Sequence, residues 1–403
     1  MTLKQKPLLE HSVIKSENLL FLTENAQNLK GKVDFIYIDP PKNLSKTASL
    51  SKDKVTKPNR RKHHERWVDF MRIRLAASRP SLKNTGFIAA SADDTIQPRL
   101  RLLMDEVFGE DNFIGMVTID TGSVINNARL VSSSHEYLLL YAKSMPVLLK
   151  SGTKWRKKRE GLDILRKQER KLRLKHGENY ESITEELREW LKSQNFPQRL
   201  KQFYNADSKG LYTYSDLSAP RNGLYYEVIN PSTGNPVSVP TRGWGVSEDT
   251  FGELIDSDQI IWGTTDSQQP LKKLYLKDTP DQVIRSVFSF PSRSPEKLLQ
   301  KILGEEVSFE EPKDLEFMKH IIDVMTPKDA LIMDFFAGSG TTGHAVLDLN
   351  YEDPTSSRKF ILCSNDENSV YSHILKPRIE AIVNGKWADR QHRPRKATIK
   401  TKF

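Results

Sequence analysis

The sequence has a single cysteine and no long apolar segment. Cys363 is alone among 403 residues, which excludes a disulfide framework and a cysteine-based zinc site. No apolar run approaches the roughly 20 residues that span a bilayer, and the amino terminus lacks the apolar core of a signal peptide. No spacing typical of metal ligands and no internal repeat is visible. We therefore expect a soluble, cytoplasmic protein with no metal, in which Cys363 is a small buried hydrophobe.

Positive charge is in excess. The formal net charge is +10, which favours a polyanionic partner such as nucleic acid. Part of the excess lies in residues 154–175, where eleven basic residues stand against three acids. Two interpretations of this segment stay open: a solvated charged helix, and a helical arm that lies along phosphates.

Residues 33–43, VDFIYIDPPKN, predict a buried strand that stops abruptly. β-branched and aromatic residues run directly into Asp39, Pro40 and Pro41. The two prolines stiffen the backbone and have no N–H, so their loop presents carbonyl groups without competing donors. A carboxylate and free carbonyls at the carboxyl end of a strand can hold an amino group, and open α/β sheets bind ligands at that edge.

A second strand end, residues 331–342 (LIMDFFAGSGTT), predicts a strand, a glycine turn and a helix. Glycine lets the backbone approach a ligand closely and tolerates positive φ, and the N–H groups at a helix start can receive an anionic group. The pattern lacks the Lys-Ser/Thr of a phosphate-binding P-loop, and its third glycine is misplaced for a dinucleotide fingerprint. About one βα unit downstream, Asp366 and Glu367 follow another strand. Two interpretations stay open: an acid that holds ribose hydroxyls, as in Rossmann-like sites, and acids in the first turn of a helix.

Strands and helices alternate on both sides of a central segment of different composition. This alternation predicts an α/β fold with a doubly wound, mostly parallel sheet. The expected helices are 65–82, with Gly86 ending that segment, a helix after Asp94 that runs through Leu100 and Phe108 and is closed by Gly109, a helix opening at Ser294 and Pro295, and 314–325. The expected strands are 87–90, 113–119, 137–141 and 360–363. Residues 203–275, rich in aromatics, Gly, Pro and Asn, have the composition of an inserted domain.

The segment 44–64 is polar and ends in the basic run NRRKHH. It has too little apolar surface to fold by itself and predicts a loop. Because it follows Asp39 directly, it stands where a lid that closes over a substrate would be attached. The carboxyl-terminal residues 386–403 form a basic, irregular tail.

The two strand ends together resemble the permuted, β-type DNA amino methyltransferases, in which Asp-Pro-Pro precedes the glycine motif. More specifically, the chain from about residue 18 to 385 resembles the modification subunits of type III restriction systems. Further matching stretches are 67–71, 102–109, 135–138, 216–220, 230–234, 243–244 and 358–362.

This resemblance implies a Rossmann-like methyltransferase fold with a seven-stranded sheet. It implies a DNA adenine N6-methyltransferase that uses S-adenosylmethionine, acts on a flipped base in double-stranded DNA, and belongs to a restriction-modification system. A homodimer and a restriction (helicase-nuclease) subunit are the implied protein partners. The implied organisation is 1–150 and 291–385 as the halves of the methyltransferase domain, 151–290 as a helical arm with a target-recognition region, and 386–403 as the tail.

The resemblance also assigns roles to residues. Asp39 and the Pro40 carbonyl would polarise the adenine amino group, within a catalytic loop that includes Pro41 and Lys42. The expected cofactor-binding residues are Asp334, Phe336, Ala337, Gly338, Ser339, Gly340, Thr341, Asp366, Glu367, Ser294 and Pro295, although the family usually shows Lys-Pro where Ser294-Pro295 stands. The expected DNA-binding residues are Arg60, Arg61, Lys62, Lys157, Lys158, Arg159, Arg221 and Arg242, since positive charge near Tyr, Trp and Asn suits phosphate and base contacts. Trp244 and Trp262 are expected in the core of the inserted region, and His135 at the start of a strand is expected to be structural.

Lys42 departs from the family pattern, because an aromatic residue belongs at that position. A lysine offers no π-face for the flipped base, and stacking is worth about 1–3 kcal/mol. Trp67, Tyr37 or His63 could supply the missing ring. The alternative is a catalytically impaired paralogue that serves as a DNA-binding or assembly subunit. A methyltransferase for RNA or for cytosine N4 is a third hypothesis, which Asp39 in place of serine disfavours.

Overall fold

The computed structural model describes residues 11–42, 60–122, 130–290 and 295–385, with the side chains of 60–63 left out. The chain divides into two compact units. The sheet unit comprises Met1–Trp155 and Ile284–Phe403, and the inserted unit comprises Arg156–Val283. The inserted unit lies within the predicted insertion, which had the bounds 151 and 290.

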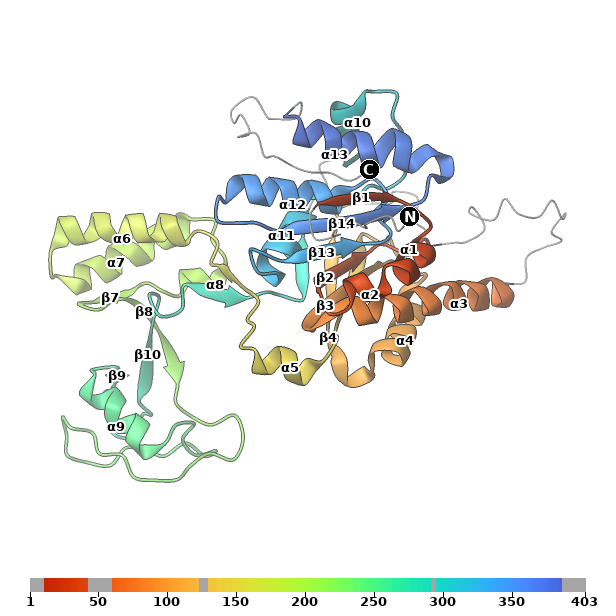
Figure 1. Ribbon diagram of the computed structural model, residues 1–403. Helices are drawn as coiled ribbons and strands as arrows, with labels where there is room; N and C mark the ends of the chain where they lie inside the picture. Colours follow the sequence, from red (N-terminus) through yellow and green to blue (C-terminus); the bar gives the residue numbers. More distant parts are fainter. Residues whose placement is uncertain (1–10, 43–59, 123–129, 291–294, 386–403) are drawn as a thin grey trace. The chain divides into compact units, whose positions relative to one another are not determined.

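An eight-stranded sheet forms the centre of the sheet unit (Figure 1). Its order is β1-β14-β13-β2-β3-β5-β4-β12, and β5 alone runs antiparallel to its neighbours. The strands are β1 Ser12–Lys15, β2 Val33–Ile38, β3 Leu82–Ala92, β4 Phe113–Asp120, β5 His135–Ala142, β12 Val287–Ser289, β13 Leu331–Asp334 and β14 Lys359–Ser364. The predicted mostly parallel α/β sheet is confirmed. The expected number of seven strands was wrong, because β12 adds a short eighth strand beside β4.

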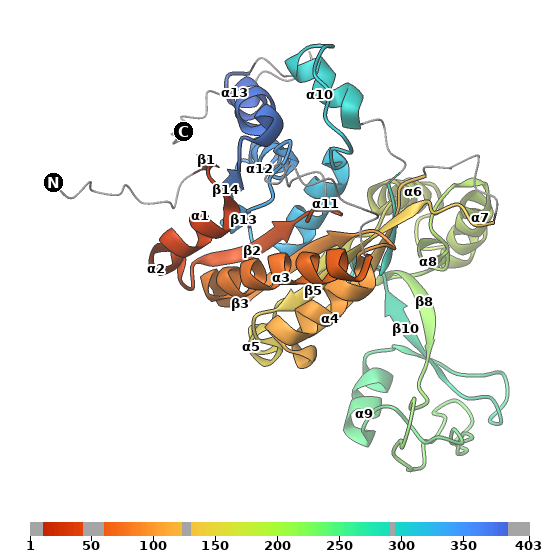
Figure 2. The same cartoon turned by 90° about the vertical axis from the view of Figure 1, so that its right-hand side faces the viewer.

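Helices cover both faces of this sheet (Figure 1 and Figure 2). Apolar side chains of α1, α3 and α4 pack with Ile36 and Ile38 on one face, and those of α11, α12 and α13 pack with Phe35 and Tyr37 on the other. Cys363 in β14 is fully buried, as expected. The helices are α1 Asn18–Glu24, α2 Ala26–Leu29, α3 Arg60–Ser78, α4 Gln97–Phe108, α5 Met145–Lys150, α10 Pro295–Leu303, α11 Leu315–Met325, α12 Thr341–Glu352 and α13 Lys376–Val383.

The connections run in opposite directions from the pair β2 and β13. From β2 the chain continues to β3 on one side, and from β13 it continues to β14 on the other. The loops that leave these two parallel strands therefore diverge at their carboxyl ends. Such a switch point is where open α/β sheets bind ligands.

Two expected element boundaries in this unit were wrong. Strand β3 already begins at Leu82, and Gly86 lies within it rather than ending a helical segment. Leu82 pairs with Val33 across an irregular register, and a Cβ on Gly86 would fall 2.9 Å from the Val33 carbonyl oxygen. The loop expected over 44–64 also ends sooner, because α3 begins at Arg60. Residues 43–59, on which the predicted lid depends, lie outside the described residues.

The inserted unit has its own elements and two apolar cores. Helices α6 and α7 pack around Leu165, Leu172 and Leu187, and a second core surrounds Trp244. Trp244 is buried in this second core, as expected, and Trp262 packs against the core while partly buried. The elements are β6 Arg156–Lys158, α6 Leu162–His176, α7 Tyr180–Ser193, α8 Gln198–Lys201, β7 Asn205–Asp207, β8 Gly210–Asp216, α9 Glu248–Asp256, β9 Ile260–Ile261, β10 Leu271–Tyr275 and β11 Asp281–Val283.

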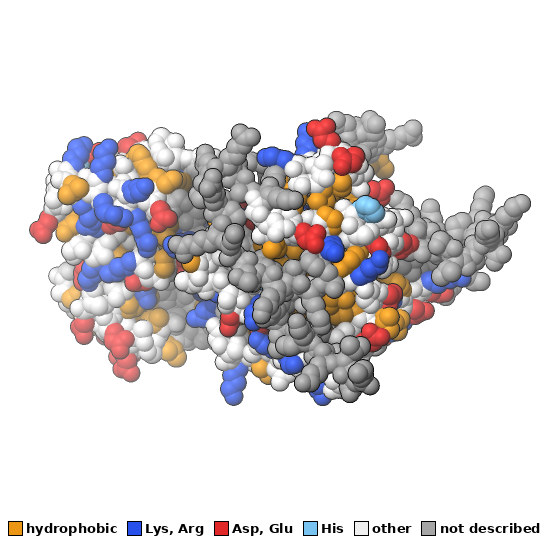
Figure 3. Space-filling view, turned by 45° about the horizontal axis from the view of Figure 1, so that its top comes forward, with side chains coloured by type: hydrophobic (Ala, Val, Ile, Leu, Met, Phe, Trp, Pro, Cys, Tyr) orange, Lys and Arg blue, Asp and Glu red, His pale blue; other side chains and the backbone are white. Residues whose placement is uncertain are grey.

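The basic segment 154–175 is not one helix. Lys157 and Lys158 lie on β6, which pairs with β11, and the helix begins after Gly161 with φ of +79°. Exposed basic residues of α6 include Lys167, Arg170 and Lys171. Figure 3 shows Lys and Arg side chains gathered over α6 and α7.

None of the helices in the described part of the chain is long and apolar enough to cross a membrane. In the same residues there is no group of three or more His, Cys, Asp and Glu that could hold a metal ion.

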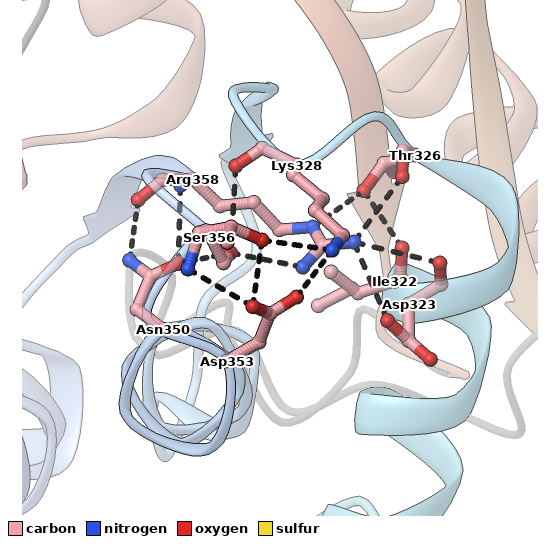
Figure 4. A network of polar contacts seen from close by, with 9 residues as sticks. Ile322, Asp323, Thr326, Lys328, Asn350, Asp353, Ser356 and Arg358 are labelled. Carbon is pink, nitrogen blue, oxygen red and sulfur yellow. Dashed lines mark hydrogen bonds and ion pairs between the residues drawn. The ribbon is translucent and has the colours of Figure 1, made fainter.

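A polar network at the amino end of β14 joins three elements (Figure 4). The Arg358 side chain is 2 % exposed and donates to the Thr326 carbonyl at 3.2 Å and the Thr326 hydroxyl at 3.1 Å. Its backbone N–H donates to Asn350 at the end of α12 at 3.1 Å. Arg358 therefore satisfies carbonyl groups at the end of α11 and fixes α11 and α12 to the sheet, away from the strands' carboxyl ends.

Replacing Arg358 by methionine is expected to lower the free energy of unfolding by about 2–4 kcal/mol, because buried acceptors at the end of α11 would lose their donor. Urea titration would measure the loss. The control is Lys328→Met, which removes an exposed pair with Asp353 and should cost less than about 1 kcal/mol. Equal losses in the two variants would contradict this role of Arg358.

Candidate functional site

Asp39 and Asp334 lie side by side at the carboxyl edge of the sheet. Asp334 is the last residue of β13 and pairs in register with Tyr37 of β2, two positions before Asp39. Residues 295 positions apart in the chain thus stand at the ends of adjacent parallel strands. The two motifs that the sequence singles out therefore share one edge of the sheet.

The Asp39 carboxylate faces a lysine and a second carboxylate. Lys313 Nζ lies 3.4 Å from Asp39 Oδ2 and 2.6 Å from Glu136 Oε2. Burial raises the pKa of Asp39, Lys313 and Lys42 lower it, and Glu136 raises it. About a third of the Asp39 side chain stays exposed, so a ligand can reach the carboxylate.

A hydrogen bond from α3 fixes the loop after Asp39. Trp67 Nε1 of α3 donates to the Pro41 carbonyl at 2.7 Å. The Tyr37 hydroxyl bonds to Ser91 Oγ at 2.8 Å, and both side chains are buried. Trp67 and Tyr37 thus support the loop and do not present a free ring face to a ligand. The third candidate for that ring, His63, has no described side chain.

Lys42 is held by two carboxylates. Its Nζ lies 2.5 Å from Glu311 Oε2 and 3.7 Å from Asp93 Oδ2. Burial lowers the pKa of Lys42, but the hydrogen bond and charge of Glu311 outweigh this and raise it overall. The Lys42 charge is therefore largely compensated within the site.

The glycine turn after β13 is tight and crowded. Gly338 has φ of +48° and Gly340 has φ of +81°, values that L side chains rarely adopt. A Cβ on Gly340 would fall 2.5 Å from a methyl carbon of Leu375. The Asp334 carboxylate accepts from Thr342 Oγ1 at 2.6 Å and from the Phe336 N–H at 3.0 Å. Burial raises the pKa of Asp334 to about 7 despite these hydrogen bonds.

A buried arginine holds this turn in place by hydrogen bonds. Arg378 of α13 is 1 % exposed and donates to the Ser339 carbonyl at 3.1 Å, Ser339 Oγ at 3.1 Å and Thr341 Oγ1 at 3.0 Å. Burial lowers the pKa of Arg378 to about 10. Sequence reasoning missed Arg378, because nothing near it in the chain marks it as a neighbour of the glycine turn.

The two acids after β14 differ in what they contact. Asp366 Oδ2 lies 2.7 Å from Lys15 Nζ, and Oδ1 accepts from the Ser372 N–H at 2.8 Å. The hydrogen bond from Lys15 is the largest cause that lowers the pKa of Asp366, to about 2. Glu367 has a long contact of 3.5 Å with Asn365. Asp366 therefore caps the following turn, whereas the contact of Glu367 is longer and makes it the less constrained of the two acids.

The sequence profile of the family described as DNA methylase matches residues 33–375 of the chain. The chain belongs to the DNA methylase family.

Three curated relatives illustrate this likeness. The methylase is 28% identical over 393 residues to the type III restriction-modification enzyme EcoP15I Mod subunit of Escherichia coli, with 89% of this chain and 59% of the relative covered. It is 29% identical over 406 residues to the StyLTI Mod subunit of Salmonella typhimurium, with 92% and 56% covered. Type II methyltransferase M.KpnI of Klebsiella pneumoniae is 29% identical over 391 residues, with 90% and 82% covered. The chain thus spans less than two thirds of the first two relatives.

A solved structure titled PvuII DNA methyltransferase (cytosine-N4-specific) has 12% identity and a TM-score of 0.43, with 95% of each chain covered. The M1.HpyAVI-SAM complex has 12% identity and a TM-score of 0.40, with 92% of this chain and 98% of that chain covered.

The segment before α11 contacts residues that follow both β2 and β13, which sequence reasoning missed. Phe309 lies 3.3 Å from where a Gly338 Cβ would stand, Glu311 bonds Lys42, and Lys313 bonds Glu136. Ser294 lies outside the described residues, and Pro295 begins α10, for which no described contact reaches the glycine turn. The sequence 309–313, FEEPK, carries no local pattern that marks it as a neighbour of Asp39.

The predicted DNA-binding residues fall into three groups. Arg60, Arg61 and Lys62 begin α3, and their side chains are not described. Arg159 is half-buried, donates to the Thr279 carbonyl at 2.8 Å and lies over the Phe203 ring, so its contacts are internal to the inserted unit. The exposed members are Lys157, Lys158, Arg221 and Arg242.

Proposed function

We propose that this methylase transfers a methyl group from S-adenosylmethionine to the N6 amino group of an adenine flipped out of double-stranded DNA. The observation that carries the proposal is the meeting of Asp39 and the glycine turn at the switch point of one sheet. A partly exposed carboxylate and a tight glycine turn on adjacent strand ends can hold an amino group next to a cofactor.

Asp39 and Pro40 act on the base in this proposal. The Asp39 carboxylate and the Pro40 carbonyl accept hydrogen bonds from the two amino hydrogens, which turns the nitrogen lone pair away from the ring. Attack of the nitrogen on the methyl carbon would break the carbon–sulfur bond and leave a neutral thioether. The proton that the amino group loses would pass through the partly exposed Asp39 carboxylate to solvent. The cofactor supplies an electrophilic methyl group on a positively charged sulfur.

The residues of the second strand end fit such a cofactor. The helix start after Gly338 and Gly340 can receive a carboxylate, and a side chain at Gly340 would collide with Leu375. Ser339 and Thr341 are held in place by Arg378. We assign the ribose hydroxyls to Glu367 rather than Asp366, because the Asp366 carboxylate is already bonded to Lys15 and Ser372.

Labelled S-adenosylmethionine and mixed-sequence duplex DNA provide the test. We expect label to enter DNA and to be recovered as N6-methyladenine after digestion to nucleosides. Recovery as N4-methylcytosine would overturn the base assignment. DNA and cofactor binding by calorimetry without any transfer would instead support the impaired paralogue that Lys42 suggests.

DNA recognition is assigned to the inserted unit. Two of its loops are joined by hydrogen bonds between Gly223 and Arg242 at 2.9 Å and between Leu224 and Trp244 at 2.9 Å. Arg221, Arg242 and Tyr225, which is 69 % exposed, lie on these loops. Arginine and tyrosine on a rigid pair of loops suit contacts with phosphates and base edges.

Removing Arg221 and Arg242 together is expected to weaken duplex binding and to lower the slope of log K against log salt by about 2, roughly 1 for each lost phosphate contact. Fluorescence anisotropy at several salt concentrations would measure the slope. Lys83→Ala is the control, because Lys83 pairs with Asp34 at the start of β2. An unchanged slope would remove these two arginines from the DNA interface.

The relatives' names suggest partners as well. Two of them are Mod subunits of type III restriction-modification enzymes, so we also propose a restriction subunit and a second copy of the chain as partners. Since the proposed substrate is duplex DNA, we propose the cytoplasm as the location.

A further inference from the structure

Lys313 joins three distant parts of the sheet unit at one point. It precedes α11, and its side chain is 14 % exposed. Its Nζ donates to Glu136 Oε2 of β5 at 2.6 Å and lies 3.4 Å from Asp39 Oδ2 after β2. The ammonium group thus stands between two carboxylates at the carboxyl edge of the sheet.

The backbone of Lys313 is anchored on both sides. Its carbonyl accepts from Thr341 Oγ1 of the glycine turn at 3.3 Å. The next residue, Asp314, caps α11 by accepting from the Phe317 N–H at 2.8 Å. A long, flexible lysine side chain is therefore held at its base by the turn and by α11, and at its tip by Glu136.

Several charged or titratable groups face Asp39. They are Lys313 from the segment before α11, Glu136 from β5, Lys42 from its own loop, Tyr37 from β2 and Asp334 from β13. Glu136, Tyr37 and Asp334 are neutral or negative and cannot stabilise a carboxylate by charge. Two cations lower the pKa of Asp39, and each also bonds another carboxylate: Lys313 bonds Glu136 and Lys42 bonds Glu311. Lys313, whose Nζ lies 3.4 Å from Asp39 Oδ2, has the larger effect of the two.

We propose that Lys313 is a positioning residue that keeps Asp39 ionised and turned so that one carboxylate oxygen stays free for the substrate amino group, and that Glu136 fixes Lys313 for this task. This inference rests on the proposed methyl transfer. Asp39 Oδ2 faces Lys313, which leaves Oδ1 for the base. Without the lysine, burial would favour the protonated carboxyl, which is a poorer acceptor.

The pH dependence of transfer tests the role. The acidic limb is the part of the pH–rate profile where activity falls as the pH is lowered and Asp39 becomes protonated. Loss of Lys313 raises the pKa of Asp39, so this fall in activity should begin at a higher pH than in the wild type. We expect Lys313→Met to move the midpoint of that limb upward by about 1 unit or more and to lower kcat near neutral pH at least tenfold. In Lys313→Arg, which keeps the positive charge, the midpoint of the acidic limb should stay within a few tenths of a pH unit of the wild-type midpoint.

The controls separate this role from general stability. Lys319→Met removes a lysine with the same 14 % exposure, paired with Glu352 on α12, and should leave the limb in place. Glu136→Gln should lower kcat without moving the limb upward, because Glu136 itself raises the pKa of Asp39. Equal limbs in wild type and Lys313→Met, with normal cofactor binding, would overturn the inference.

A second measurement does not depend on methyl transfer. Carboxyl ¹³C NMR of protein labelled at aspartate, with Asp39→Asn to assign the signal, would titrate Asp39 directly. A higher midpoint in Lys313→Met would support the inference even if the wild type transferred no methyl group, a result that overturns the proposed function alone. An unchanged midpoint would overturn the inference.

Discussion

Asp39→Asn is expected to lower the rate of methyl transfer by about 10²–10³-fold or more. The substitution keeps the shape of the side chain but removes the negative charge and turns one acceptor oxygen into a donor. An amide donor facing the amino group of the base would repel its hydrogens instead of drawing them. Single-turnover transfer at saturating DNA would measure the loss.

Cofactor affinity should stay within a few-fold of wild type in Asp39→Asn, since the glycine turn is built on β13 and is held by Arg378. The matched control is Asp34→Asn on the same strand. Asp34 lies at the start of β2, where it contacts Lys83 and the Leu331 N–H, far along the strand from Asp39. Transfer by Asp39→Asn within tenfold of wild type would show that Asp39 does not hold the base.

Local sequence patterns were enough to locate the two strand ends. A β-branched run followed by Asp39 and two prolines, and an apolar run followed by Asp334 and a glycine turn, each determine their own geometry within a few residues. Their meeting at one edge of the sheet agrees with the rule that places ligands at the switch point of an α/β sheet. These parts of the site depend little on distant contacts.

The residues that complete the site could not be found in this way. Lys313 reaches Asp39 across 274 positions of the chain, and Arg378 reaches Ser339 from another helix. A lysine that follows a proline, or an arginine in an amphipathic helix, has the same local sequence pattern whether it faces solvent or completes a site. Their roles come from tertiary contacts, which periodicity and composition do not encode.

Element boundaries failed for a related reason. Gly86 looks like a terminator in the sequence, yet it lies inside β3 because the Val33 backbone passes too close for a side chain. Lys157 and Lys158 continue a basic run in the sequence, yet they form β6 because β11 pairs with them. In both places a partner strand far along the chain overrides the local propensity.

Lys42→Tyr is expected to raise kcat/KM for DNA by about 5- to 150-fold, because a ring would supply the roughly 1–3 kcal/mol of base stacking that a lysine lacks. Trp67 and Tyr37 do not offer this face, since both are buried and bonded to Pro41 and Ser91. Lys42 also lowers the pKa of Asp39, so the variant should be assayed at mildly alkaline pH, where that carboxyl stays ionised.

Lys42→Met separates the ring from the charge, because it also frees Glu311 but adds no aromatic face. A gain confined to Lys42→Tyr would attribute the effect to stacking, whereas equal gains in the two variants would attribute it to the lost ammonium group. If the wild type transfers no methyl group and Lys42→Tyr restores transfer, the natural chain is the impaired paralogue, with an intact cofactor site beside a catalytic loop that lost its ring. An active wild type that gains nothing from tyrosine would mean that the flipped base is held without a ring at position 42, and that the ion pair between Lys42 and Glu311 belongs to a working site.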